Sequence, residues 1–311
     1  MIRIESLTKK YGNTLAVNNI SLEIEKGCIL GFLGPNGAGK STTMKILTGI
    51  IPATSGKAFV CDIDVANSPL EAKKKIGYLP EGIAFYNEMT VHNYLEFAAE
   101  AKAISKQKRK SEISSVIEKC SLQDVSKRII GNLSKGYKQR VGLAQAIIGS
   151  PEVLILDEPT VGLDPSQIIQ IRELIKSYAG KSTVILSTHI LQEVTNICTH
   201  TAIINKGKIF SQGQIDEINK TDKKRLSCIV KVNSEDINII LSNINGIDNI
   251  NLINKIDQVN DISEFLITSN SNVDLREEIV SVLSQSNAKL LELYQIKSSI
   301  EDTYLKILSN S

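Results

Sequence analysis

The chain has 311 residues, of which 42% are hydrophobic and 23% charged, an ordinary composition for a globular protein. A formal net charge of +2 gives no basis for a general attraction to nucleic acid. The five cysteines lie far apart, which argues against a disulfide framework or a zinc site and favours free thiols in a reducing cytosol. The N-terminus lacks the apolar segment of a signal peptide, and no apolar run of about 18 residues predicts a membrane-spanning helix.

The first 25 residues alternate loosely between apolar and polar positions. Two strands are expected, one around Ile4 and one around Leu22, with Tyr11 and Gly12 in the turn between them. This predicts an antiparallel β part at the N-terminus. The ring of Tyr11 can stack on a purine base, although packing on the surface or in the core is the commoner role of such a residue.

A glycine-rich segment, Gly34–Ser41, reads GPNGAGKS and fills every fixed position of the phosphate-binding pattern G-x-x-x-x-G-K-[ST]. A short apolar strand is expected before it and a helix from Ser41 to Leu47 after it, so the helix N-terminus would face the phosphates. Lys40 supplies a point charge, and the Ser41 hydroxyl can bind Mg²⁺. The alternative is a glycine-rich turn that merely precedes a helix.

The next part of the chain returns to strands and then becomes helical. After a turn at 52–56 we expect a strand up to Val60 and another over Lys73–Pro80, followed by Glu81. From about residue 89 to 150 the apolar spacing predicts a helical subdomain inserted into the core, with Thr90 capping its first helix. The basic run Lys106–Lys110 is expected between its first two helices, as a solvated loop or a helix end.

Two fully apolar runs follow, each ending in polar residues. In the segment LSKGYKQR, Ser134 is expected to cap a helix. The run VLIL then ends at Asp157 and Glu158, and the run TVIL ends close to His189, with a crossover helix between the two. This order predicts a parallel sheet. Asp157 can hold a Mg²⁺-bound water and Glu158 can accept a proton from an attacking water, unless the pair is simply a surface acidic pair at a strand end.

The C-terminal region has a different organisation. A charged linker near Asn219–Arg225 marks a boundary between residues 1–220 and a second domain, 226–311. The order βαββαβ in the second domain predicts a small ferredoxin-like α+β fold. A capping box, Ser298-x-x-Glu301, is expected to open a last helix. The predicted fold class is therefore an α/β P-loop ATPase core with an accessory C-terminal domain.

The order of the motifs GPNGAGKS, YLPE, LSKGYKQR, VLILDEPTVGLDP and ILSTH resembles that of ATPase subunits of ABC (ATP-binding cassette) transporters. The resemblance covers residues 1 to about 215 and is closest to single-cassette subunits of the type-two exporters, the gliding-motility and multidrug export group. It implies ATP and Mg²⁺ as cofactors. It also implies that Tyr11 stacks on adenine with Val17 beside the base or ribose, and that the phosphate loop consists of Gly34, Pro35, Asn36, Gly37, Ala38, Gly39, Lys40, Ser41 and Thr42.

The resemblance assigns further roles outside the phosphate loop. Glu158, His189 and Lys40 would be catalytic, with His189 linking the γ-phosphate to Glu158. Asp164 would lie at a dimer seam. The metal ligands would be Ser41, Asp157 and Glu81. The signature segment that faces the other subunit's nucleotide would be Ser134, Lys135, Gly136 and Tyr137, with Ser134 and Gly136 contacting its γ-phosphate.

Three positions depart from the commonest family pattern. Glu81 stands where the family has Gln, Lys135 replaces a Gly and Tyr137 replaces a Gln, whereas Gly136 is kept. A carboxylate at position 81 can still bind Mg²⁺ or its water, but it brings negative charge near the γ-phosphate. These changes leave the details of the contacts between subunits and the hydrolysis rate open.

The implied protein is an ATP-hydrolysing subunit on the cytosolic face of the membrane. It would dimerise around MgATP, with itself or a homologue, and drive a separately encoded permease, in an exporter and without binding nucleic acid. One alternative is an ABC ATPase that acts on ribosomes or DNA, but those usually carry two cassettes or a long coiled coil. The other is a regulatory subunit with little turnover, against which Glu158 and His189 argue.

Overall fold

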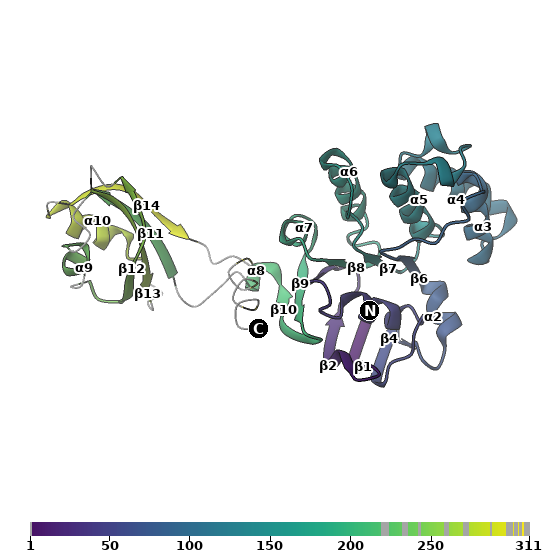
Figure 1. Cartoon of the computed structure of the whole chain (residues 1–311), viewed down its shortest axis with the longest axis horizontal. Coiled ribbons are helices and arrows are strands. Elements are labelled where there is room, and N and C mark those ends of the chain that lie inside the picture. Colours follow the sequence, from purple (N-terminus) through teal and green to yellow (C-terminus); the bar gives the residue numbers. More distant parts are fainter. Residues whose placement is uncertain are drawn as a thin grey trace. The chain divides into compact units, whose positions relative to one another are not determined.

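The computed structural model of the chain is shown in Figure 1. It describes residues 2–218, 224–231, 236–241, 244–257, 261–269, 274–286 and 288–296, together with 301, 304 and 307. The chain divides into two compact units, the first built on Met1–Ile215 and the second on Asp216–Leu305. Among the described residues, no helix is both long and apolar enough to cross a membrane.

The centre of the first unit is a six-stranded sheet with the strand order β10-β9-β3-β8-β7-β6. Its neighbouring strands are parallel except for the antiparallel hairpin of β9 and β10 at one edge. The predicted parallel sheet is therefore confirmed. The strands are β3 (Ile29–Leu33), β6 (Ile76–Leu79), β7 (Val153–Asp157), β8 (Thr183–Thr188), β9 (His200–Asn205) and β10 (Lys208–Gln214).

Both faces of this sheet are covered, which explains the fully apolar runs in its strands. In β7, Val153 and Ile155 pack into a core shared with the antiparallel sheet of the same unit. The alternate residues Leu154 and Leu156 pack into a second core, shared with the helical subdomain. All four side chains are 0% exposed, so β7 is buried on both sides and its carboxyl end is held firmly.

A second, antiparallel sheet has the strand order β2-β1-β4-β5, as expected for the N-terminal part. The helix α1 (Lys40–Leu47) contacts β2 and β4 of this sheet as well as β7 of the parallel sheet. This packing fixes the helix that follows the phosphate loop. The four strands are β1 (Ile2–Tyr11), β2 (Thr14–Ile24), β4 (Ser55–Val60) and β5 (Ile63–Asp64).

The helical subdomain gathers α3, α4 and α5 at one end of the first unit (Figure 1). Thr90 caps α3 by accepting a hydrogen bond of 3.2 Å from the backbone N–H of Asn93, which confirms its predicted role. The basic run Lys106–Lys110 does not lie between two helices but forms the N-terminal end of α4, which is one of the two roles predicted for it. Lys, Gln and Arg are good helix formers, so the helix extends upstream of its apolar stripe. The elements of the helical subdomain are α3 (Val91–Ala101), α4 (Lys106–Lys119), η1 (Gln123–Val125), η2 (Ile130–Asn132) and α5 (Lys135–Ile147).

A second correction concerns the predicted strand Lys73–Pro80. Its first three residues end a helix, α2 (Pro69–Lys75), and the strand β6 begins only at Ile76. Proline at the first helical position and basic residues in the last turn both favour this helix.

Two further helices flank the strands that end at the motifs, namely α6 (Pro165–Lys176), which is the predicted crossover helix, and α7 (Leu191–Ile197).

The second unit is a four-stranded antiparallel sheet with two helices packed against it. The strand order is β12-β13-β11-β14, and the order of elements along the chain is βαββαβ, as predicted. The charged linker and the last helix were placed partly on residues 219–223 and 297–300, which lie outside the described residues. The elements are α8 (Ile215–Ile218) at the boundary, then β11 (Lys224–Lys231), α9 (Asp236–Leu241), β12 (Ile247–Asp257), β13 (Ile262–Ser269), α10 (Arg276–Ser284) and β14 (Lys289–Ile296).

The close packing of α5 on β6 gives a prediction for stability. A Cβ atom added at Gly77 would lie 2.0 Å from the carbonyl oxygen of Ala146 and 2.8 Å from Cγ of Pro151. Gly77→Ala should therefore lower the free energy of unfolding by about 1–3 kcal/mol through overpacking. Thermal unfolding measures this, with Gly82→Ala as the control, since a Cβ there meets nothing within 4 Å. Equal melting temperatures for both variants would contradict the packing described.

Candidate active site

The phosphate loop is wedged between two strands, and its glycines are required by this geometry. A Cβ added at Gly34 would lie 2.2 Å from the carbonyl oxygen of Ile204 in β9, and one at Gly39 would lie 2.5 Å from that of Ala16 in β2. Gly37 and Gly39 also adopt positive φ angles, 79° and 108°. Since α1 begins directly after Gly39, the first backbone N–H groups of the helix are available to an anion held by the loop.

The Lys40 side chain lies at the opening of this loop and is only 5% exposed. Its Nζ donates hydrogen bonds to the carbonyl oxygens of Gly34, at 2.7 Å, and Pro35, at 3.2 Å. The same nitrogen forms an ion pair of 3.3 Å with Oε1 of Glu158. The loop cation is thus held by its own backbone and by the acidic residue that follows β7.

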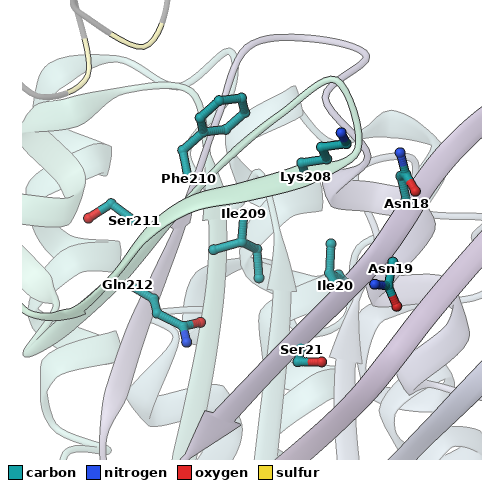
Figure 2. A pocket seen from close by; sticks show the side chains of 9 residues that line it. All are labelled: Asn18, Asn19, Ile20, Ser21, Lys208, Ile209, Phe210, Ser211 and Gln212. Atoms are coloured by element: carbon teal, nitrogen blue, oxygen red, sulfur yellow. The ribbon is translucent and has the colours of Figure 1, made fainter.

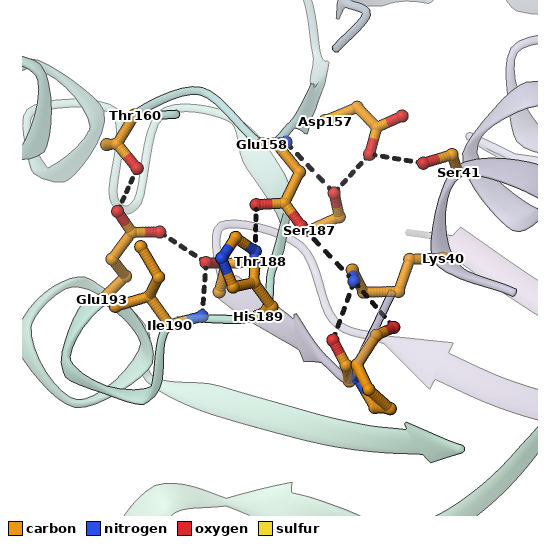
Figure 3. Close-up of polar contacts among 12 residues, drawn as sticks. Lys40, Ser41, Asp157, Glu158, Thr160, Ser187, Thr188, His189, Ile190 and Glu193 are labelled. Carbon is orange, nitrogen blue, oxygen red and sulfur yellow. Dashed lines mark hydrogen bonds and ion pairs between the residues drawn. The ribbon is translucent and has the colours of Figure 1, made fainter. Parts of the chain in front are cut away.

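Asp157 joins three structural elements through one oxygen. Its Oδ1 accepts hydrogen bonds from the hydroxyl of Ser41, at 3.2 Å, and from that of Ser187 (Figure 3). The carboxylate of Asp157 is 1% exposed. A hydroxyl and a carboxylate beside a phosphate loop are oxygen donors of the kind that Mg²⁺ prefers, because this ion is usually held by one or two protein oxygens together with substrate phosphates.

Glu158 points away from its neighbour Asp157. The chain leaves β7 with a φ of 52° at Glu158, and its backbone N–H donates to the carbonyl oxygen of Ser187. One carboxylate oxygen meets Lys40, and the other lies 3.0 Å from Nδ1 of His189, whose side chain is 41% exposed. Figure 3 shows the two adjacent acidic residues serving different partners. The structure therefore brings together Lys40, Ser41, Asp157, Glu158 and His189.

Three polar residues of this region were not assigned from the sequence. Ser187 holds Asp157, Gln139 of α5 donates from Nε2 to the carbonyl oxygen of Pro159 at 2.8 Å, and Glu193 of α7 accepts from two threonines. Ser187 lies just before His189, and Gln139 lies inside the motif LSKGYKQR. Their positions within recognised motifs could therefore have indicated a role at the site. Glu193 gave no such indication, because a single Glu in a short helix does not reveal that it is buried.

The signature segment, residues 134–137, which was predicted to face the other subunit's nucleotide, begins α5 and lies beside α6. Ser134 caps α5 by accepting a 3.4 Å bond from the N–H of Tyr137, as predicted. A Cβ added at Gly136 would lie 2.3 Å from Oε1 of Gln167, and one at Gly162 would lie 2.0 Å from Nζ of Lys135. The segment thus packs closely against the loop and helix that follow β7.

Asp164 caps α6. Its carboxylate accepts hydrogen bonds from the hydroxyl of Ser166, at 2.6 Å, and from the N–H of Gln167, at 2.9 Å. These bonds lower the pKa of Asp164. In the part of the chain that the structure describes, no hydrogen bond of Ser134 or Asp164 reaches the cluster around Glu158.

The residues predicted to bind the adenine and the residue Glu81, predicted to bind Mg²⁺, lie on different strands or loops. Tyr11 is 48% exposed at the end of β1, whereas Val17 is fully buried, with Cγ2 3.5 Å from a Cβ built at Gly39. Glu81 is exposed and follows β6, the neighbour of β7. Burial, followed by the charges of Asp157 and Glu81, raises the pKa of Tyr78 in β6.

A surface hollow lies between β2 and β10, away from the residues described so far (Figure 2). It is open and lined by side chains that belong to none of the motifs. The candidate active site is instead the carboxyl edge of the parallel sheet, where ligands bind in α/β folds. The residues that line the hollow are Asn18, Asn19, Ile20, Ser21, Lys208, Ile209, Phe210, Ser211 and Gln212.

Comparison with known proteins agrees with this site. The family model described as "ABC transporter" matches residues 17–161. The bacitracin transport ATP-binding protein BcrA of Bacillus licheniformis is 38% identical over 73% of this chain and 74% of its own length. The chain belongs to the family of ABC transporter ATP-binding subunits. It is an ATP-binding and ATP-hydrolysing subunit of a transporter, which confirms the resemblance seen in the motifs.

Two further proteins are similar to this ABC subunit. The lantibiotic transport ATP-binding protein SrtF of Streptococcus pyogenes is 37% identical over 70% of this chain and 92% of its own length. A solved dimeric ATP-binding cassette in a post-hydrolysis state, bound to ADP and Pi, superposes with a TM-score of 0.64. It is 23% identical and covers 69% of this chain and 98% of its own, so it shows the fold. The predicted P-loop ATPase fold is confirmed.

The position of Lys40 leads to a prediction for nucleotide binding. Lys40→Ala should weaken the affinity for MgATP by roughly 10–100-fold, because it removes charge-assisted hydrogen bonds worth about 1.5–3 kcal/mol. Titration calorimetry measures the affinity, and Lys45→Ala, an exposed lysine on the same helix, is the matched control. An unchanged affinity in folded Lys40→Ala protein would show that Gly34–Ser41 is not the nucleotide site.

Proposed function

We propose that two copies of this subunit, or one copy and a homologue, bind MgATP between them on the cytosolic face of a membrane and drive a separately encoded permease. The observation that carries the proposal is the placement of Glu158. Its carboxylate lies between Lys40 and His189, beside the oxygen pair of Ser41 and Asp157. This arrangement suits the activation of a water next to a bound phosphate chain.

In this proposal residues 1–220 hold all of the nucleotide site. Tyr11 stacks on the adenine and Val17 lies beside the base or ribose, while the backbone N–H groups of residues 36–42 hold the phosphates. Ser41 and Asp157 would hold Mg²⁺, with Glu81 approaching it from the neighbouring strand. When bound, Mg²⁺ would offset the charge of the phosphates.

Glu158 acts as the general base that accepts a proton from the attacking water. His189 keeps the Glu158 carboxylate in place through its Nδ1 and is available to hydrogen-bond the γ-phosphate with its other ring nitrogen. Lys40 stabilises the charge that develops on the phosphate oxygens. The positive φ at Glu158 supports this division of work, because it aims Glu158 and Asp157 at different partners.

The second copy completes each site in the proposed dimer. Ser134 and Gly136 contact the γ-phosphate bound by the partner subunit, Lys135 and Tyr137 belong to the same signature segment, and Asp164 lies at the seam. The segment packs against the loop after β7 of its own chain, so it can carry information from the partner's nucleotide to Glu158. A solved ATP-binding cassette with the same fold is dimeric and holds ADP and Pi, which supports a dimer but not the individual contacts.

The direction of transport is inferred from the relatives and from the motifs. Proteins named for bacitracin and lantibiotic transport are similar to this chain, and its motifs resemble those of exporter subunits. We therefore place it in an export system. Residues 226–311 form an accessory α+β domain in this proposal, since they contain none of the ATPase motifs.

The different roles of the two acidic residues can be separated by substitution. Glu158→Gln should keep MgATP binding, because Lys40, Ser41 and Asp157 are untouched, and should lower hydrolysis by roughly 10²–10⁴-fold through loss of the base. Unhydrolysed ATP should then hold two chains together. Size-exclusion chromatography with and without MgATP should show a dimer only when MgATP is present.

Asp157→Asn provides the matched control for this experiment. It should lose the Mg²⁺ dependence of ATP binding and form no ATP-dependent dimer. Normal ATP turnover by Glu158→Gln would remove the general-base role. A Glu158→Gln protein that binds MgATP but stays monomeric would contradict the proposed dimer instead.

The proposed division of the chain is also testable. A chain that ends at Lys220 should still bind MgATP with an affinity within about threefold of the full chain, because every proposed nucleotide contact precedes that residue. Circular dichroism checks folding and calorimetry measures binding. A folded, shortened chain without nucleotide binding would show that residues 226–311 contribute to the site.

A further inference from the structure

A buried carboxyl group lies behind the proposed catalytic residues. Glu193, on α7, is 0% exposed, and its two oxygens accept hydrogen bonds from two different hydroxyls. Oε1 accepts from Thr160, and Oε2 accepts from Thr188 at 2.6 Å. Figure 3 shows Glu193 between the two threonines, on the far side of the cluster from Lys40. Both threonines are also buried, at 2% and 0% exposed.

The two threonines lie close in sequence to Glu158 and His189, one in the loop after β7 and the other at the end of β8. Thr160 is two residues after Glu158, in the loop that follows β7. Thr188 directly precedes His189, and its Oγ1 also accepts a 3.0 Å hydrogen bond from the N–H of Ile190. The Thr188 hydroxyl therefore fixes the backbone on both sides of His189, and Glu193 ties that segment to the loop of Glu158.

These bonds form a second connection between the same two loops. The first is the contact between Glu158 and His189 themselves, which is partly exposed. The second, through Glu193, is buried and does not take part in that contact. A carboxyl group in such a place is costly unless hydrogen-bonded, and a satisfied buried network fixes one geometry more tightly than apolar packing would. Burial, and to a smaller extent the charge of Glu193, raises the pKa of the nearby Cys198 thiol.

We propose that Glu193, through Thr160 and Thr188, is a positioning residue that sets the distance and orientation between Glu158 and His189. The proposal rests on the catalytic roles given to Glu158 and His189 above. It predicts an effect on the chemical step and not on nucleotide binding. Lys40 and Asp157 are held by other bonds, to the phosphate loop and to Ser41 and Ser187, so the binding half of the site does not depend on Glu193.

Loss of one link should loosen the loops without unfolding them. The loop after β7 remains attached through Gln139, which donates to the carbonyl oxygen of Pro159, and through the bonds of the Glu158 N–H to Ser187. What is lost is the fixed orientation of the catalytic pair. Misplacement of a reacting group by about 1 Å can cost a factor of up to about 10² in rate.

The test compares the kinetics of Thr160→Val and Thr188→Val with those of the unmodified full chain. Valine keeps the shape of threonine and removes the hydroxyl that Glu193 binds. We expect kcat for ATP hydrolysis to fall about 10-fold in each variant, with the KM for MgATP within about twofold. Thr195→Val is the matched control, because Thr195 is an exposed threonine on α7, the helix that carries Glu193. This variant should keep the wild-type kcat.

Two conservative variants separate hydrogen bonding from packing. Thr160→Ser keeps the hydroxyl and loses only a methyl group, so it should recover most of the rate lost in Thr160→Val. Glu193→Gln keeps the volume, and its amide can accept from one threonine and donate to the other, so its kcat should lie between those of the wild type and Thr160→Val. If Thr160→Ser is as slow as Thr160→Val, packing and not the hydroxyl is responsible, and the proposal is wrong.

A double-mutant cycle with His189→Ala completes the test, since coupling between two residues appears only as non-additivity. If Thr160 acts through the catalytic pair, Thr160→Val should slow the His189→Ala protein by less than about twofold. The same 10-fold loss in both backgrounds, or a wild-type kcat in Thr160→Val, would overturn the positioning role. A wild-type kcat in His189→Ala itself would instead contradict the proposed catalytic role of His189.

Discussion

The site depends on a single buried oxygen. Oδ1 of Asp157 accepts hydrogen bonds from Ser41, at the start of α1, and from Ser187, near the end of β8. Because β3, β8 and β7 are neighbours in one parallel sheet, these three polar residues all emerge at its carboxyl edge. Apolar packing on both faces of β7 holds the strand end. The hydrogen bond between Oδ1 of Asp157 and Ser41 then fixes the position of the phosphate loop relative to Asp157 and Glu158.

Much of this arrangement can be predicted from the sequence, because the pattern and the local geometry agree. The run VLIL predicts a strand buried on both faces, and GPNGAGKS predicts the loop whose Gly34 and Gly39 touch backbone oxygens of other strands. Ser134 is predictable as a helix cap because the capping bond is local. These features need no knowledge of distant contacts.

The remaining features depend on partners far away in the sequence. The three lysines at 73–75 read as the start of a strand, but Pro69 and the contacts of α2 make them the end of a helix. Glu193 has no sequence signal, since its partners Thr160 and Thr188 come from two other elements. The contact of Lys135 with the loop at Gly162 is equally invisible, because it joins the start of α5 to the segment before α6. In each case tertiary packing, and not local propensity, decides the structure.

The adjacent carboxylates of Asp157 and Glu158 need a physical means of being kept apart, and the backbone at Glu158 provides it. A non-glycine residue at a φ of 52° is strained by about 1–3 kcal/mol, so surrounding bonds must hold it there. The N–H of Glu158 is bound to both oxygens of Ser187, and the next carbonyl, that of Pro159, is bound to Gln139. These bonds come from β8 and α5, so the strain is maintained by the same elements that carry His189 and the signature segment. A movement of α5 would therefore act first on the backbone that orients Glu158, which gives the proposed partner contacts a direct physical route to the proposed general base.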